Sequence, residues 1–128
     1  MSKQLLPKAR ILVVDDEPLN VRLLERMLDL FGGIDYRCTT DPREAVSLFA
    51  EFQPDLVLTD LHMPHLDGIQ LIREIRAKED YRYVPILLLT TESQAAKKQE
   101  AKEAGATGWI VKPFVQEKLL EVVQKVIR

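Results

Sequence analysis

The sequence has one cysteine, Cys38, and no long apolar run. A lone cysteine cannot form an internal disulfide, which favours a reducing compartment, so we expect a cytoplasmic protein in which Cys38 is a packing residue. No apolar stretch approaches the roughly 18 residues that span a bilayer. The opening segment MSKQLLPKAR has no apolar signal core, which argues against secretion. We therefore predict no membrane insertion.

Strong charge imbalance, internal repeats and low-complexity segments are also lacking. Lys and Arg number 18 against 20 Asp and Glu, and a net charge of -2 gives no reason to expect direct binding to nucleic acid. The chain has no Walker-type loop and no Gly-x-Gly-x-x-Gly motif. No linker rich in Pro, Gly or Ser divides its 128 residues. We predict one domain over residues 1–128, with residues 1–8 as a flexible N-terminal tail.

Short apolar runs alternate with amphipathic segments along the whole chain. The strongest runs are continuous, which is typical of parallel strands that are covered on both faces. The five runs are Ile11–Val14, Tyr36–Cys38, Leu56–Leu58, Ile86–Leu89 and Trp109–Val111. Five strand–helix units in tandem predict an α/β fold of the (βα)5 type, a doubly wound, flavodoxin-like parallel sheet in the order 2-1-3-4-5.

Helix boundaries are indicated by capping and breaking residues. Pro18 suits the first turn of the first helix. Asp41 is predicted to cap the second helix, with Glu44 three residues later in an arrangement close to a capping box. Ser93 is predicted to cap the fourth helix, which would close at Gly105.

Polar residues follow the predicted strands. Asp15 and Asp16 end the first strand, Asp60 ends the third, Thr90 ends the fourth and Lys112 ends the fifth. In such sheets ligands bind at the carboxyl ends of the strands, near the point where the strand order reverses. Like charges about 4 Å apart repel by roughly 4 kcal/mol at an effective dielectric of 20, so the acids indicate a bound cation.

This set of groups predicts a particular chemistry. Hard oxygen ligands with room for water suit Mg²⁺. A lone carboxylate near a divalent cation and a lysine can attack phosphorus and form an aspartyl phosphate. The metal and Lys112 would neutralise charge on the phosphoryl oxygens, and the Thr90 hydroxyl could bond one of them.

Four segments resemble the response-regulator receiver domains of two-component signalling: VVDDEP, DLVLTDLHMPHLDG, PILLLTTES and GATGWIVKPF. The resemblance spans essentially the whole chain. It implies a phosphorylation-activated switch that is not an enzyme beyond assisting its own phosphorylation and dephosphorylation. The phosphoryl group would come from a sensor histidine kinase or a phosphotransfer protein. The sequence does not distinguish a free-standing, chemotaxis-type regulator from a receiver excised from a longer protein.

The resemblance also assigns the metal and phosphoryl ligands. It makes Asp60 the phosphoacceptor and a metal ligand, and Asp16 a direct ligand of Mg²⁺. Asp15 would bind the metal mainly through water. His62 would contribute only its backbone carbonyl, and for the neighbouring His65 we prefer a solvated loop residue to a transition-metal ligand.

The resemblance further implies how the switch works. Thr90 would be the switch hydroxyl, and Lys112, joined to Pro113 by a cis peptide bond, would contact the phosphoryl group. The state would be relayed through the face of the fourth helix, fifth strand and fifth helix. Trp109 occupies the aromatic switch position, where Tyr or Phe is usual, so it is either a switch or a packing residue. Thr91 stands where a small residue is common.

Other classes of protein fit less well. In a flavodoxin-like electron carrier, the acids of DDEP would repel the FMN phosphate. A haloacid-dehalogenase-like phosphatase requires two Asp residues separated by one residue, whereas Asp15 and Asp16 are adjacent and Glu17 follows. A receiver-like scaffold that is not phosphorylated commonly lacks an acid or the lysine, and here all are present.

Overall fold

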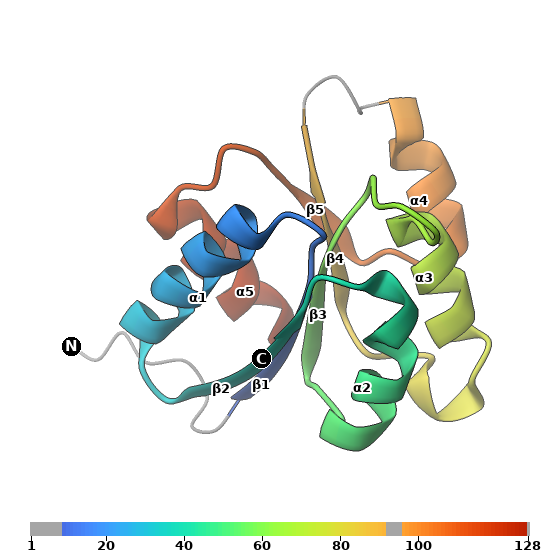
Figure 1. Cartoon of the computed structure of the whole chain (residues 1–128), viewed down its shortest axis with the longest axis horizontal. Helices are drawn as coiled ribbons and strands as arrows, with labels where there is room; N and C mark the ends of the chain where they lie inside the picture. The colour runs from blue at the N-terminus through green and yellow to red at the C-terminus, as the bar shows by residue number, and fades with distance from the viewer. Residues whose placement is uncertain (1–8, 92–95, 128) are drawn as a thin grey trace.

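The computed structural model describes residues 9–91 and 96–127, which form a five-stranded parallel sheet with helices on both faces (Figure 1). The strand order is β2-β1-β3-β4-β5, as predicted. The strands are β1 (Ala9–Val14), β2 (Ile34–Thr39), β3 (Leu56–Asp60), β4 (Ile86–Thr90) and β5 (Gly108–Val111). The α-helices are α1 (Pro18–Phe31), α2 (Ala45–Phe52), α3 (Gly68–Arg76), α4 (Lys98–Ala104) and α5 (Gln116–Ile127). The 3-10 helices η1 (Pro42–Glu44) and η2 (Glu79–Tyr81) precede α2 and β4.

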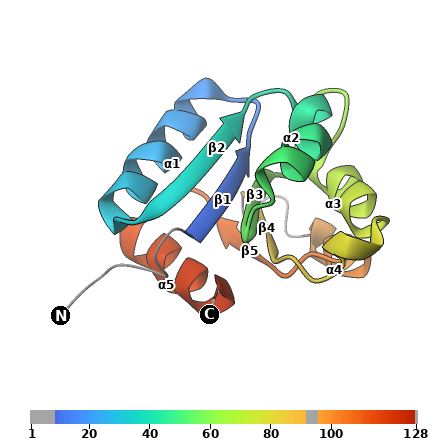
Figure 2. The ribbon, with the colours of Figure 1, turned by 90° about the horizontal axis from the view of Figure 1, so that it is seen from below.

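The sheet is buried between two layers of helices. Helices α1 and α5 cover one face, and α2, α3 and α4 cover the other (Figures 1 and 2). In β1, Ile11 and Val13 pack in the first layer while Leu12 and Val14 pack in the second, so that every residue of the run is buried. This double burial explains why the apolar runs of the sequence are continuous. Among the described residues, no helix is long and apolar enough to span a bilayer.

The predicted ends of two helices are confirmed. Helix α1 begins at Pro18, and Gly32 follows its last residue with a φ of 74°. Gly105 closes α4 with a φ of 114°. Such positive φ angles favour glycine, which has no Cβ to clash with the carbonyl groups nearby. Ser93, the predicted cap of the fourth helix, lies outside the described residues.

The prediction of an α-helix directly after Asp41 is wrong by one turn. The Asp41 carboxylate does cap a helix, accepting from the Arg43 N–H at 2.9 Å, but that helix is the 3-10 segment η1. The Glu44 carboxylate does not complete a capping box. It accepts from the Thr39 hydroxyl at 3.1 Å, and that hydroxyl accepts from the Asp41 N–H at 3.0 Å. In a capping box the Glu44 carboxylate would accept from the Asp41 N–H, but here the buried Thr39 hydroxyl bonds to both of these groups.

Cys38 lies in β2, half-buried against the core layer formed by α1 and α5. Burial raises the pKa of its thiol to about 12, and the nearby Glu25 carboxylate adds to the shift. The thiolate is the reactive form of cysteine, so this thiol is inert at neutral pH. The structure is therefore consistent with the predicted packing role.

Candidate functional site

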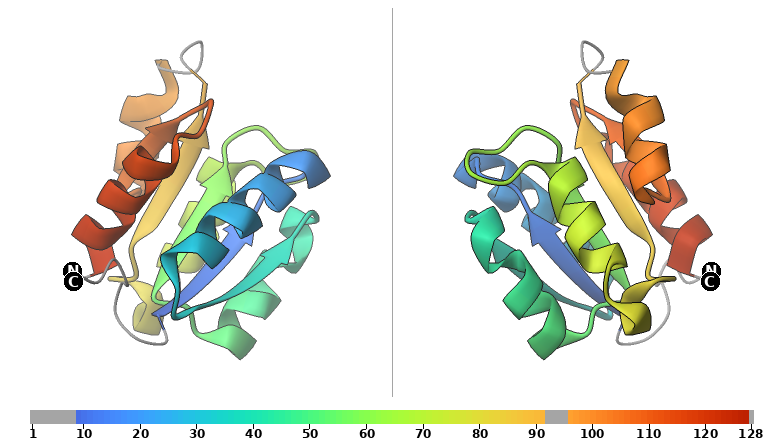
Figure 3. Two further views of the ribbon diagram at one scale, coloured as in Figure 1. Left: turned by 90° about the vertical axis from the view of Figure 1, so that its left-hand side faces the viewer. Right: turned by 90° about the vertical axis from the view of Figure 1, so that its right-hand side faces the viewer.

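The three predicted acids lie together at the carboxyl end of the sheet. All strands point to the same edge (Figure 3), and β1 and β3 are neighbours with Val14 opposite Thr59. One carboxylate oxygen each from Asp15, Asp16 and Asp60 lies within 4.8 Å of the others. Parallel pairing of two central strands thus places residues that are 45 positions apart in the sequence side by side.

Asp15 is fully buried at the end of β1. Its Oδ1 accepts from the Glu17 N–H at 3.0 Å, and its own N–H donates to the Thr39 carbonyl at 3.2 Å. Burial raises the pKa of the Asp15 carboxyl to about 6, and the Asp60 carboxylate adds to the shift against the opposing effect of the Glu17 N–H. Burial therefore makes the ionised form of Asp15 costly, and the nearby Lys112 ammonium offsets this cost only in part.

Lys112 supplies the positive charge of the site. Its Nζ donates to Asp60 Oδ1 at 3.0 Å and lies 3.9 Å from Asp15 Oδ2. The Lys112 N–H donates to the carbonyl of Thr90, which fixes the end of β5 against the end of β4. The bond between Lys112 and Pro113 is cis. One ammonium group thus faces two of the three clustered carboxylates.

Two polar atoms of the site are buried without a hydrogen-bond partner among the described residues. They are Asp15 Oδ2 and Thr90 Oγ1. Buried side-chain oxygens are nearly always hydrogen-bonded in folded proteins, so unpartnered ones mark a place where a ligand completes the bonding. An acceptor beside three carboxylates fits a hard cation, and a hydroxyl can donate to an anion.

Among the described residues, the imidazoles of the two loop histidines do not join this cluster. His62 is exposed in the loop after β3, and His65 is exposed there with a φ of 72°. Trp109 is half-buried in β5 and Thr91 is half-buried after β4.

Sequence reasoning missed Gly68, the first residue of α3, as a residue that shapes the site. A Cβ at this position would collide with the backbone carbonyl oxygen of Asp60 and lie 2.8 Å from Leu88 Cδ2. The Gly68 N–H also donates to the Leu61 carbonyl at 2.8 Å. Glycine is therefore required for α3 to start against the end of β3. The signal was present in the motif HLDG, where a glycine follows a helix-capping aspartate.

The comparisons with known proteins identify the family. Residues 11–124 match the response regulator receiver domain. The chain belongs to the response regulator receiver domain family. It is 34% identical over 117 residues to chemotaxis protein CheY-3 of Vibrio cholerae, covering 91% of this chain and 90% of the relative. It is 36% identical over 119 residues to the regulatory protein AtoC of Escherichia coli, covering 93% of this chain but 25% of that protein.

Solved structures of receiver domains are closely similar. Chemotaxis protein CheY4 of Vibrio cholerae matches with a TM-score of 0.87 and 37% identity, covering 93% of this chain and 98% of that one. The receiver domain of a sensor histidine kinase from Pseudomonas aeruginosa matches with a TM-score of 0.85 and 33% identity, covering 94% and 98%. That structure has a magnesium ion coordinated in its active-site cleft. The receiver chain spans nearly all of some relatives and a quarter of AtoC.

Family membership establishes the general function. Receiver domains of response regulators and of histidine kinases are phosphorylation-activated switches in two-component signalling, and so is this receiver. They are regulators rather than classical enzymes. The match over residues 11–124 therefore favours the switch over the phosphatase alternative.

Proposed function

We propose that this chain is a single receiver domain in which Asp60 accepts a phosphoryl group from a sensor histidine kinase or a phosphotransfer protein. The observation that carries the proposal is the ion pair of 3.0 Å between Asp60 Oδ1 and Lys112 Nζ, at the centre of the acidic cluster. A carboxylate held beside a cation, at the end of a strand whose neighbour ends at the Thr90 hydroxyl, which has no hydrogen-bond partner among the described residues, is suited to hold a transferred phosphoryl group.

The donor set fits Mg²⁺. Asp15, Asp16 and Asp60 offer hard oxygen ligands, and the backbone carbonyl of His62 would add a fourth. The buried Asp15 Oδ2, which has no hydrogen-bond partner among the described residues, supports this assignment. When bound, Mg²⁺ would supply positive charge to the carboxylates and to the phosphoryl oxygens.

The hydrogen bonds at Asp60 indicate which oxygen reacts. Oδ1 accepts from the Leu61 N–H at 2.9 Å and from Lys112 Nζ at 3.0 Å. We infer that Oδ2 is the nucleophile, because its lone pairs are not used by these two donors. The Oδ2–P bond forms as the P–N bond of a phosphohistidine donor breaks, and the electron pair returns to the imidazole nitrogen. The Lys112 ammonium and the Thr90 hydroxyl then donate to phosphoryl oxygens.

Chemical phosphorylation tests the proposal. Acetyl phosphate with Mg²⁺ should produce an acid-stable, base-labile adduct of one phosphoryl group, which peptide mass spectrometry should place on Asp60. Asp60→Asn should remove the adduct while the protein remains folded by circular dichroism. A persistent label on a different residue of the wild type would refute the assignment.

We also propose that the phosphorylation state is relayed to a partner through the face of α4, β5 and α5, and that Trp109 is the aromatic residue whose environment changes with that state. Phosphorylation would draw the Thr90 hydroxyl toward the phosphoryl oxygens and leave space beside Trp109, so the environment of the indole should change. Trp109 is the only tryptophan of the chain. Its fluorescence should therefore change when beryllofluoride and Mg²⁺ are added.

The hydroxyl of Thr90 provides the control for this experiment. Thr90→Ala should reduce the fluorescence change, whereas Thr90→Ser, which keeps the hydroxyl, should retain most of it. Beryllofluoride binding is measured separately by calorimetry. Unchanged emission in wild type with Asp60 occupied would mean that Trp109 only packs, and the signal would have to leave by another face.

A further inference from the structure

A lysine of α4 lies against the ring of Trp109. The Lys98 Nζ is 4.7 Å from the centroid of the indole, within the range of a cation–π interaction. Both side chains are half-buried, which strengthens such an interaction relative to full exposure. Lys98 is the first residue of α4 and Trp109 lies in β5, so the contact joins a helix to the edge strand of the sheet.

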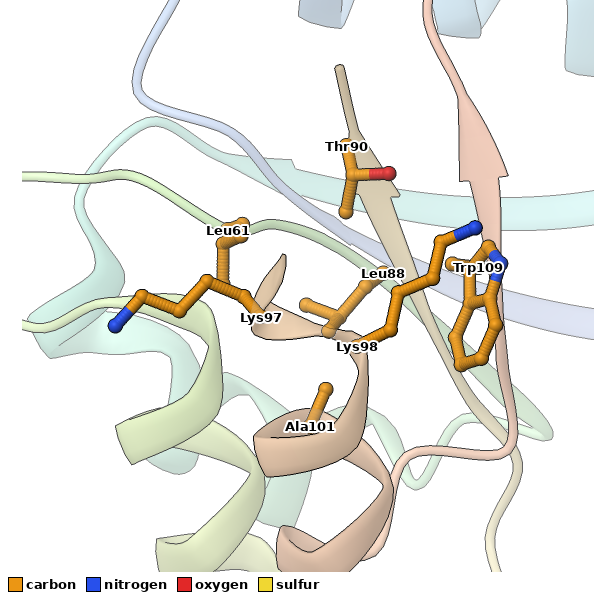
Figure 4. Close-up of a pocket in the computed structure, with 7 residues that line it drawn as sticks. All are labelled: Leu61, Leu88, Thr90, Lys97, Lys98, Ala101 and Trp109. Atoms are coloured by element: carbon orange, nitrogen blue, oxygen red, sulfur yellow. The ribbon is translucent and has the colours of Figure 1, made fainter. Parts of the chain in front are cut away.

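The same two residues line a narrow cavity that reaches Thr90 (Figure 4). Its walls also include Leu61, Leu88, Lys97 and Ala101. The cavity has no room for a water molecule, and an indole is much larger than water. Movement of Trp109 toward Thr90 therefore requires the walls of this cavity to shift, both Thr90 and the first turn of α4, which carries Lys98.

Helix α4 contacts α3 at both ends, with the Arg73–Glu100 ion pair of 3.9 Å in its first turn and Arg76 at its carboxyl end. At its carboxyl end, the Arg76 guanidinium of α3 donates two hydrogen bonds to the Gly105 carbonyl, at 2.9 and 3.1 Å. Near its start, the exposed Lys97 lies 3.4 Å from Glu100 of the same helix. Among the described residues, Lys98 has no carboxylate within 4.0 Å, and the Trp109 ring is the group that its ammonium faces. Lys97 and Lys98 are thus adjacent cations with different partners.

We propose that Lys98 is a positioning residue that holds Trp109 in its resting position and so opposes activation. The inference rests on the proposed function, in which occupation of Asp60 draws the Thr90 hydroxyl away and opens space that Trp109 enters. A contact present in the resting state and lost in the active state shifts the equilibrium toward rest. For a cation–π contact at a half-buried site, the shift should be about two- to fivefold in the affinity for an activating ligand.

Beryllofluoride affinity in the presence of Mg²⁺, measured by calorimetry, tests the proposal. Lys98→Met removes the charge and keeps an unbranched side chain of similar length, so it should bind beryllofluoride about two- to fivefold more tightly than wild type. Lys98→Arg keeps a cation for the ring and should bind as wild type does. Lys97→Met is the matched control for loss of one positive charge near the site, and it should also bind as wild type does.

The resting emission of Trp109 provides a second readout that needs no ligand. Lys98→Met should shift the emission maximum, since it removes a charge beside the indole, whereas Lys97→Met should leave the maximum unchanged. Equal beryllofluoride affinities for Lys98→Met and Lys97→Met would overturn the positioning role, and so would equal emission spectra. If wild type itself binds no beryllofluoride, the assignment of Asp60 fails instead, and the emission spectra alone decide whether Lys98 positions the ring.

Discussion

Gly68→Ala is expected to lower the free energy of unfolding by about 2–4 kcal/mol, because the new methyl group has no space. Its Cβ would collide with the backbone carbonyl oxygen of Asp60 and approach Leu88 Cδ2 at 2.8 Å. The carbonyl belongs to β3, which is paired on both sides, so it cannot move without disturbing the sheet. Urea denaturation with and without the substitution measures the difference.

Gly33→Ala is the matched control for this substitution. Gly33 has a φ of 72°, and a Cβ there would meet nothing within 4 Å, so the cost should be only the backbone strain of about 1 kcal/mol. Gly68→Ala should also slow the labelling of Asp60 by acetyl phosphate, whereas Gly33→Ala should not. Equal losses of stability in the two variants would show that the carbonyl of Asp60 does not limit the space at Gly68.

Asp15→Asn should make the metal-free protein more stable at pH 8, by on the order of 2 kcal/mol. The pKa of Asp15 is raised from 3.8 to about 6 by burial, so the folded protein holds this proton more tightly than the unfolded chain does. The contribution of the Asp15 proton to the free energy of unfolding is therefore fully present below pH 4 and is lost as the pH rises through about 6. The Asn variant should lack this decline. Thermal unfolding between pH 4 and pH 8 in the presence of a chelator measures both curves.

Mg²⁺ should make wild type more stable than Asp15→Asn, which is the reverse of the order without metal. A ligand at 100 times its dissociation constant stabilises the folded state by about 2.7 kcal/mol, so wild type should gain strongly, while Asp15→Asn should gain less. Asp16→Asn provides a second test, because Asp16 is only half-buried in the same cluster. It should weaken the Mg²⁺ effect while leaving the metal-free protein at least as stable as wild type. Equal Mg²⁺ shifts in all three proteins would argue against a metal site at these acids.

Much of the fold could be predicted because burial acts on each strand separately. A strand covered on both faces needs apolar residues at every position, and Ile11–Val14 satisfies this within four residues. The convergence of Asp15, Asp16 and Asp60 followed from the strand order alone, since neighbouring parallel strands end at one edge. Family resemblance, rather than spacing, supplied the separate roles of these acids.

The features that could not be predicted depend on contacts that cross from one helix or strand to another. The capping box of Asp41 and Glu44 fails because Thr39, from the preceding strand, offers a competing hydroxyl. The cation–π contact of Lys98 depends on how closely α4 packs against β5, and no local sequence pattern determines that distance. A charge-rich helix start is usually a solvated surface, so no sequence pattern pairs this lysine with the indole.

The site is divided between the interior and the edge of the sheet, and this division affects how the protein can evolve. Two of the acids directly follow β1 and the third ends β3, whereas Trp109 lies in β5 and Lys112 directly follows it. Strand β5 has a strand neighbour on one side only. If the signal leaves through α4, β5 and α5 as proposed, substitutions along the free side of β5 would alter which protein binds the activated receiver without changing the carboxylates. Phosphoryl chemistry and partner binding could thus change separately. Duplicated copies of such a gene could then diverge in the partner proteins that they bind while the phosphoryl chemistry stays the same.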